Sequence, residues 1–245
     1  MKKEKNEKIK LKKLLRFFGI EFSVACEKVA VLLIKEKNLK VAIYEKYGEI
    51  LVEITSKCKT QEECVELINS KKEQIISILH EYYIGEDDET LEIVLLNLLK
   101  EKNKQLITVE SCTGGLIGEK ITAVPGSSEN YLGGLITYSN EMKKTLCKVK
   151  NQTLEMFGAV SKGTAIEMAE GALKYCNAHI AVSVTGLAGP GGATKYKPVG
   201  LVYIGVATEN ESDAFRFYFN GTREEIRNQS ANNAIYQVIL KLRSI

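Results

Sequence analysis

Residues 109–143 read VESCTGGLIGEKITAVPGSSENYLGGLITYSNEMK, and this stretch decides the fold of the larger part of the chain. The apolar run Leu106–Val109 is typical of a buried strand, and Gly114–Ala123 has the pattern of a helix. A second strand is predicted at Leu135–Tyr138, followed by a helix that carries Lys143. Strands that alternate with helices indicate an α/β domain.

The flanking sequence continues this alternation. Upstream, apolar residues from Leu91 to Leu99 recur at helical spacing and predict one more helix. Downstream, the predicted elements are helices at Glu141–Val149, Gln152–Phe157 and Thr222–Leu242, a helix capped by Ser161 that runs to Cys176, a strand at Ile180–Val184, and a hairpin of Val199–Thr208 with Ala214–Phe219.

Residues 1–83 predict a small α+β unit. The expected elements are helices at Leu11–Phe18 and Ser23–Lys35, strands at Lys40–Tyr44 and Glu49–Thr55 joined at Tyr47-Gly48, and a helix at Gln61–Tyr82 capped by Thr60. A glycine and four acidic residues follow in Ile84–Thr90, which is typical of an exposed boundary. We therefore divide the chain into a small α+β domain at 1–85 and a larger domain at 86–245.

Composition narrows the class of protein. The 245 residues carry a net charge of +3, and residues 1–13 alone hold seven lysines and two glutamates. The remainder is slightly acidic, so we expect no broad basic face and no nucleic-acid partner. There is neither an apolar run of about 18 residues nor a signal-peptide pattern, so we expect a cytoplasmic protein without a membrane partner.

Cysteine and histidine usage bears on metals. The six cysteines are scattered without a C-x-x-C pair, and the chain has two histidines, His80 and His179. This supply fits neither a zinc site nor Ser-His-Asp catalysis. We expect reduced thiols, no metal and no other cofactor.

The remaining chemistry is that of hydroxyls and a lysine. A lysine held away from water has a lowered pKa and can accept a proton from a serine, so Lys143 is a candidate base. Ser128, in the PGSS turn, and Ser139, one helical turn before Lys143, are both candidate nucleophiles. The residues alone do not separate them. The alternative is that both serines are helix caps and Lys143 is a surface lysine.

Two further segments are candidate binding sites. The SCTGG turn (Ser111, Cys112, Thr113, Gly114, Gly115) follows a strand and opens a helix, an arrangement that attracts anions. The loop Gly186–Pro198 is rich in glycine, and Arg223 opens the last helix, where it suits a phosphate or carboxylate. The alternative for Arg223 is an ion pair with Glu224 or Glu225.

Seven motifs in order carry a family resemblance: ESCTGG, VPGSS, YSNEMK, GAVS, TGLAGP, KPVG and GTREEIR. Over Leu91–Leu242 the chain resembles the C-terminal domain of CinA-type proteins, the nicotinamide-nucleotide amidohydrolases. Residues 1–90 resemble the KH-like domain that precedes it in that family, notably at LRFFGIEF and YIGEDDETLE, although no G-x-x-G loop is present. The family's N-terminal molybdopterin-binding-like domain has no counterpart in this sequence.

The resemblance implies a fold and an activity. The implied fold is a three-layer α/β/α sandwich with a mixed sheet. The implied reaction is metal-independent deamidation of nicotinamide mononucleotide (NMN) to nicotinic acid mononucleotide and ammonia. Ser128 would be the nucleophile, Lys143 the base and Tyr138 its helper. The residues expected to hold the nucleotide are Ser111, Thr113, Gly114, Gly115, Thr185 and Arg223.

Three questions stay open at this point. Asn220 stands where the family often has proline, and GGATKY replaces a more acidic stretch, so a different nucleotide amide is one alternative substrate. A regulatory or nucleic-acid-binding protein of the competence- and damage-inducible type, with a vestigial amidase, is the alternative function. Whether the chain forms a homo-oligomer is not decided by the sequence.

Overall fold

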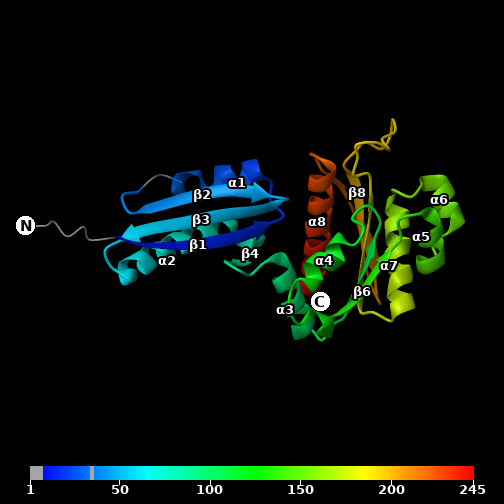
Figure 1. Ribbon diagram of the computed structural model, residues 1–245, viewed down its shortest axis with the longest axis horizontal. Helices are drawn as coiled ribbons and strands as arrows, with labels where there is room; N and C mark the ends of the chain where they lie inside the picture. The colour runs from blue at the N-terminus through cyan, green and yellow to red at the C-terminus, as the bar shows by residue number, and fades with distance from the viewer. Residues whose placement is uncertain (1–7, 34–35) are drawn as a thin grey trace, which may run out of the picture. The chain divides into compact units, whose positions relative to one another are not determined.

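The computed structural model describes residues 8–33 and 36–245, and the chain forms two compact units that divide between Thr90 and Leu91 (Figure 1). The first unit is a four-stranded antiparallel sheet in the order β2-β3-β1-β4. Its strands are β1 (Ile9–Phe18), β2 (Leu39–Lys46), β3 (Glu49–Cys58) and β4 (Tyr83–Glu86), and its helices are α1 (Phe22–Val29) and α2 (Gln61–Leu79).

The helix predicted at Leu11–Phe18 is wrong, because this segment is strand β1. Its ten residues pair in unbroken register with β3, from Ile9 opposite Cys58 to Phe18 opposite Glu49. Alternate residues such as Leu15 and Phe17 enter the core, a period of two that short apolar runs do not distinguish from a helix. Sheet pairing therefore overrides the local helical pattern.

The other predictions for this unit fared better. The strands β2 and β3 and their turn at Tyr47-Gly48 are confirmed, and both turn residues have positive φ. Thr60 caps α2 by accepting from the Glu63 amide. The helix predicted at Ser23–Lys35 is shorter than expected, since α1 ends at Val29 and a 3-10 turn, η1 (Ala30–Leu32), follows. Residues 34–35, like the basic residues 1–7, lie outside the described part of the chain.

The second unit is a three-layer α/β/α sandwich, as expected (Figure 1). Its mixed sheet has the order β6-β5-β7-β8-β9, in which β6, β5 and β7 are parallel, β8 pairs antiparallel with β7, and β9 pairs antiparallel with β8. The strands are β5 (Leu106–Glu110), β6 (Tyr131–Ile136), β7 (Ile180–Gly186), β8 (Leu201–Thr208) and β9 (Ser212–Tyr218).

Helices cover both faces of this sheet. On one face, α8 (Arg223–Arg243) packs on β7 and β8, and α3 (Leu91–Glu101) and α4 (Leu116–Thr122) pack against α8. On the other face lies α7 (Lys162–Cys176), with α5 (Asn140–Cys147) and α6 (Asn151–Phe157) packed on it. A Cβ at Gly171 of α7 would lie 1.8 Å from the Cys147 carbonyl oxygen, so this glycine permits the close approach that anchors α5.

Within the second unit, strand β6 differs from its predicted limits. It starts at Tyr131 and ends at Ile136, four residues before and two residues short of the predicted limits. Its glycines Gly133 and Gly134 concealed the start of the strand, because glycine is uncommon in strands and Gly133 has positive φ where the register shifts.

Among residues 8–33 and 36–245, no helix combines the length and the apolar character that crossing a bilayer requires.

Candidate active site

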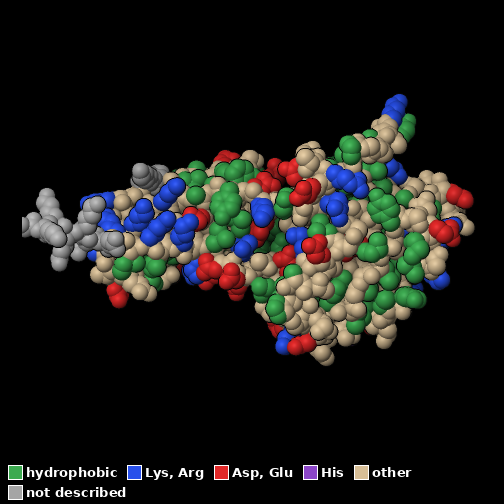
Figure 2. Space-filling view, viewed as in Figure 1, with side chains coloured by type: hydrophobic (Ala, Val, Ile, Leu, Met, Phe, Trp, Pro, Cys, Tyr) green, Lys and Arg blue, Asp and Glu red, His purple; other side chains and the backbone are tan. Residues whose placement is uncertain are grey.

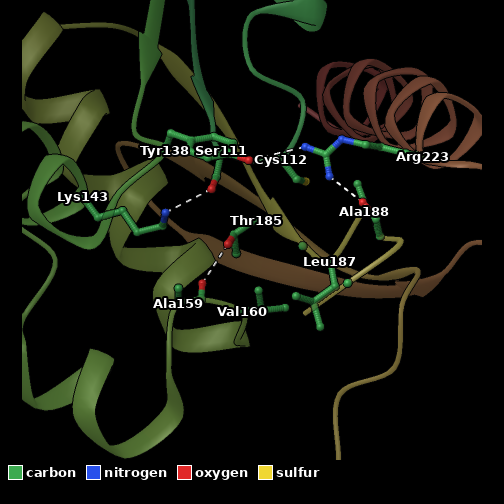
Figure 3. Close-up of a pocket in the computed structure, with 13 residues that line it drawn as sticks. Ser111, Cys112, Tyr138, Lys143, Ala159, Val160, Thr185, Leu187, Ala188 and Arg223 are labelled. Atoms are coloured by element: carbon green, nitrogen blue, oxygen red, sulfur yellow. Dashed lines mark hydrogen bonds between the residues drawn. The ribbon is translucent and has the colours of Figure 1, made fainter. Parts of the chain in front are cut away.

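A pocket of about 260 Å³ opens where the parallel strands end (Figure 3). Its wall is formed by residues that follow β5 and β6 and by the end of β7 with the loop after it. The turn before α7 and the start of α8 complete it. The lining residues are Ser111, Cys112, Tyr138, Lys143, Ala159, Val160, Thr185, Gly186, Leu187, Ala188, Gly189, Gly191 and Arg223. The carboxyl ends of parallel strands are the usual position for a ligand site in α/β folds.

Lys143 is the buried charge-bearing group of this pocket. Ser139 caps α5 by accepting from the Met142 amide, and this places Lys143 in the first turn of the helix. The side chain is 1% exposed, and its Nζ donates to Ser111 Oγ at 3.0 Å and to the Thr137 carbonyl at 2.7 Å. The surface-lysine alternative is therefore wrong, whereas the cap interpretation of Ser139 is confirmed.

The surroundings of Lys143 favour its neutral form. Burial lowers the pKa of the Lys143 amine, and the nearby thiols of Cys112 and Cys147 oppose this only in part. No carboxylate of the described residues lies within ion-pairing distance of Nζ. Burial also raises the pKa of the Cys112 thiol to about 12, so that thiol stays protonated at neutral pH.

The anion site predicted at the start of α4 is already filled by the protein itself. The buried carboxylate of Glu110 accepts from the amides of Gly115, Ile117 and Gly118 at 2.9, 3.1 and 2.9 Å. An external anion would have to displace it. Of the SCTGG residues predicted to hold a nucleotide, Ser111 lines the pocket, whereas Thr113, Gly114 and Gly115 do not.

Ser128 lies away from this pocket. It is an exposed residue of η3 (Ser127–Glu129), three residues before β6 begins. Strand β6 runs parallel to β5, with Tyr131 opposite Leu106 and Ile136 opposite Glu110. Ser128 and Ser111 therefore sit at opposite ends of the sheet, separated by about five strand residues or ~16 Å. Within one chain, the hydroxyl beside Lys143 is that of Ser111.

Tyr138, Thr185 and Arg223 line the pocket, as Figure 3 shows. The Arg223 guanidinium donates to the Gly189 carbonyl at 2.6 Å and to Tyr138 Oη at 3.4 Å. Tyr138 is 64% exposed and bonds to Arg223, not to Lys143. Thr185 Oγ1 donates to the Ala159 carbonyl at 2.7 Å.

The ion pair considered for Arg223 does not form. The guanidinium bonds to the loop and to Tyr138, whereas Glu225 caps α8 by accepting from the Thr222 amide and hydroxyl. Arg223 thus keeps N–H groups available at the pocket rim.

Two residues near the pocket were not anticipated. Glu110 could have been suspected, because it is an acid at the end of a predicted strand directly before a glycine turn. Arg227, which bonds to the carbonyls of that turn, follows Arg223 by four residues and so lies on the same helix face. In the described ranges, no three His, Cys, Asp or Glu side chains gather as a metal site would need.

Two family models match the chain, one in each unit. The model described as the CinA C-terminal domain matches residues 88–242, and the one described as the damage-inducible protein CinA KH domain matches residues 12–85. A relative from Caldicellulosiruptor saccharolyticus is 43% identical over 241 residues, 98% of this chain and 58% of its own length. A "CinA-like protein" from Kosmotoga olearia is 41% identical over 223 residues, 91% of this chain and 54% of its own. The chain thus spans little more than half the length of these relatives.

Solved structures resemble the second unit in extent and fold. A competence/damage inducible protein from Agrobacterium tumefaciens aligns with a TM-score of 0.60 at 38% identity, covering 62% of this chain and 93% of its own. A competence-damaged protein (CinA) superfamily protein from Klebsiella pneumoniae aligns with a TM-score of 0.62 at 30% identity, covering 63% and 97%.

Proposed function

Because the chain belongs to the CinA family, we propose that residues 91–245 form a serine amidohydrolase that converts NMN to nicotinic acid mononucleotide and ammonia. The observation that carries the proposal is the buried Lys143 amine, 3.0 Å from the Ser111 hydroxyl in a pocket whose rim holds Arg223. A serine beside a lysine of lowered pKa is an activated nucleophile.

In the proposed reaction, Ser111 Oγ attacks the carboxamide carbon while its proton passes to the neutral Lys143 amine. The carbonyl oxygen becomes an oxyanion. The Cys112 amide is the donor we assign to it, because it follows the nucleophile directly in the chain and donates to no backbone oxygen of the described residues. Amides of the PGSS turn are too far away for this role, since that turn lies at the other end of the sheet.

The second half of the reaction returns the enzyme to its starting state. The tetrahedral intermediate collapses, the C–N bond breaks, and Lys143 gives its proton to the departing nitrogen, so that ammonia leaves. A water molecule then attacks the acyl-serine ester with Lys143 again accepting the proton. Lys143 then returns this proton to Ser111 Oγ as the ester C–O bond breaks, which releases the carboxylate product and restores the Ser111 hydroxyl.

Arg223 is the proposed phosphate ligand. Its planar guanidinium can bind two phosphate oxygens at once, and it is a cationic group on the pocket wall separate from Lys143. The phosphate would compete with the Gly189 carbonyl for these N–H groups.

Ammonia release by the purified chain tests the function. We expect release from NMN and much slower release from nicotinamide riboside, which has the same amide but no phosphate. A chain that releases ammonia from neither compound would refute the amidase proposal. Equal rates on both would leave an amidase but remove the phosphate role of Arg223.

The identity of the nucleophile is tested by a pair of alanine variants. We expect Ser111→Ala to lower turnover about a thousand-fold or more, because the attacking atom is lost. Ser128→Ala, which changes an exposed residue, should stay within about threefold of the parent. Mass spectrometry of acid-quenched enzyme should place the acyl group on the peptide containing Ser111.

The family resemblance implies the reverse result. If Ser128→Ala were inactive and Ser111→Ala active, the nucleophile would be Ser128. A second chain or a rearrangement would then have to bring that hydroxyl to Lys143.

A further inference from the structure

Arg227 forms hydrogen bonds with the backbone of the turn that follows Ser111. Its Nε donates to the Cys112 carbonyl at 3.2 Å, and its Nη2 donates to the Thr113 carbonyl at 2.6 Å. These two carbonyls belong to the two residues directly after Ser111. One side chain of α8 therefore holds the backbone on the carboxyl side of the hydroxyl that Lys143 contacts.

The charge of Arg227 is committed to this turn. The guanidinium is half-buried and makes no ion pair with any described carboxylate. Its hydrogen-bond partners among the described residues are these two carbonyls. The turn continues into Gly114, whose φ of 61° is a left-handed backbone conformation that favours glycine. Charge-assisted bonds of this forked kind fix direction as well as distance.

The amino side of Ser111 is also fixed. Its own amide donates to the Val184 carbonyl at 3.0 Å, and the preceding Glu110 carboxylate is bound to the start of α4. Without Arg227, the carboxyl side of the turn would lose these two hydrogen bonds to α8. The Ser111 hydroxyl and the Cys112 amide would then be held less firmly, although the Glu110 bonds to α4 and the Ser111 amide bond would remain.

We propose that Arg227 is a positioning residue for the amidase reaction, which holds the Ser111–Thr113 turn so that the Ser111 hydroxyl and the Cys112 amide keep their alignment with Lys143. This inference rests on the proposed function. Arg227 does not line the pocket, so it acts through the turn and not on the substrate.

Its helical neighbour Arg223 offers a sharp contrast. Arg223 lies one turn earlier on α8, lines the pocket, and holds the loop and Tyr138. Loss of Arg223 should therefore raise KM, whereas loss of Arg227 should lower kcat. Burial is the main cause of the lowered pKa of Lys143, so the midpoint of the pH dependence of kcat should stay nearly the same when Arg227 is replaced.

The experiment compares four variants of the full chain: Arg227→Met, Arg227→Lys, Arg223→Met and, as a matched control, Arg243→Met, which removes an exposed arginine from the other end of the same helix. For each variant we would measure kcat and KM for NMN, the pH profile of kcat, and the rate at which p-nitrophenyl acetate acylates Ser111. Circular dichroism melts would report folding.

We expect Arg227→Met to lower kcat about 10- to 100-fold, the effect of a misplacement near 1 Å, with KM and the pH midpoint unchanged. Arg227→Lys should not restore kcat, because lysine lacks the planar fork whose Nε and Nη2 reach the two carbonyls in fixed directions. Arg243→Met should match the parent. The proposal would be overturned by a normal kcat in both Arg227 variants or by a change in KM alone. A shifted pH midpoint, or loss of folding in both variants, would also overturn it.

The acylation assay separates this proposal from the function. If the parent chain is acylated at Ser111 but does not release ammonia from NMN, the NMN proposal fails while Arg227 is still tested by the acylation rate. If Ser111 is not acylated in the parent, Ser111 is not the nucleophile, and the positioning role proposed for Arg227 is refuted as well.

Discussion

Burial gives Lys143 the property that the proposed reaction requires of its base. A lysine in water at pH 7 is deprotonated about once in a few thousand molecules. The Lys143 amine is enclosed by protein, and burial lowers its pKa because the charged form loses hydration. When neutral, Nζ can donate to the Thr137 carbonyl and present its lone pair to Ser111 Oγ, so the 3.0 Å contact can carry a proton in either direction.

The pH dependence of activity follows from this shift. Protonated Lys143 cannot accept the serine proton, so kcat should fall as pH drops through the lowered pKa and level off above it. The midpoint should lie below the ordinary lysine value of 10.5. Lys143→Arg should be inactive, because arginine stays protonated at every pH of the assay.

Turnover between pH 5 and 10 is the measurement. Lys144→Arg, a change in the neighbouring lysine that pairs with Glu141 at the surface, is the control and should keep full activity. Near-normal turnover in Lys143→Arg would make Lys143 an electrostatic anchor, and the base would have to be sought at Tyr138.

At the scale of elements, Glu110 links strand β5 to helix α4. The helix has seven residues and begins after a glycine that offers no side-chain cap. The carboxylate from the end of β5 replaces that cap by accepting three amides. Because the strand supplies the cap, the turn between them, including Ser111, is held from both sides.

Glu110→Ala should therefore destabilise the protein markedly. Three buried or half-buried amides would lose a charged acceptor, for which we expect a loss of about 3 kcal/mol in the free energy of unfolding. Glu119→Ala, in the same helix but exposed, should change it by less than ~0.5 kcal/mol. Urea unfolding measures both. Equal stabilities would show that the cap contributes little.

At the scale of the whole molecule, each unit has its own sheet and its own buried core. All residues that line the pocket lie in the second unit, between Ser111 and Arg223. The match to the CinA C-terminal domain has nearly the same limits as this unit. The proposed reaction therefore uses groups from the second unit alone.

A fragment of residues 86–245 should fold and deamidate NMN with kcat/KM within about twofold of the full chain. A cooperative thermal transition together with ammonia release would check this. A folded fragment without activity would show that the first unit takes part in the reaction, and the full chain assayed beside it provides the reference.

Much of this molecule was predictable from local sequence. Alternating buried strands and amphipathic helices indicated an α/β domain, and Ser161 was predicted as the cap of the helix that it does begin. Local chemistry indicated Lys143 and Arg223 as site residues, whereas Thr185 and the sandwich came from the family resemblance. Local pattern failed where pairing decides the conformation, as in β1, where a helical pattern of leucines becomes a strand once β3 supplies its hydrogen bonds.

Which groups meet was decided only by the tertiary structure. The sequence places Ser128 and Ser139 closer to Lys143 than Ser111, which is 32 residues away. The parallel pairing of β5 with β6 brings Ser111 and Lys143, which follow these two strands, to one end of the sheet and leaves Ser128 at the other. Direction and register of strands are properties of long-range pairing, and no local pattern determines them.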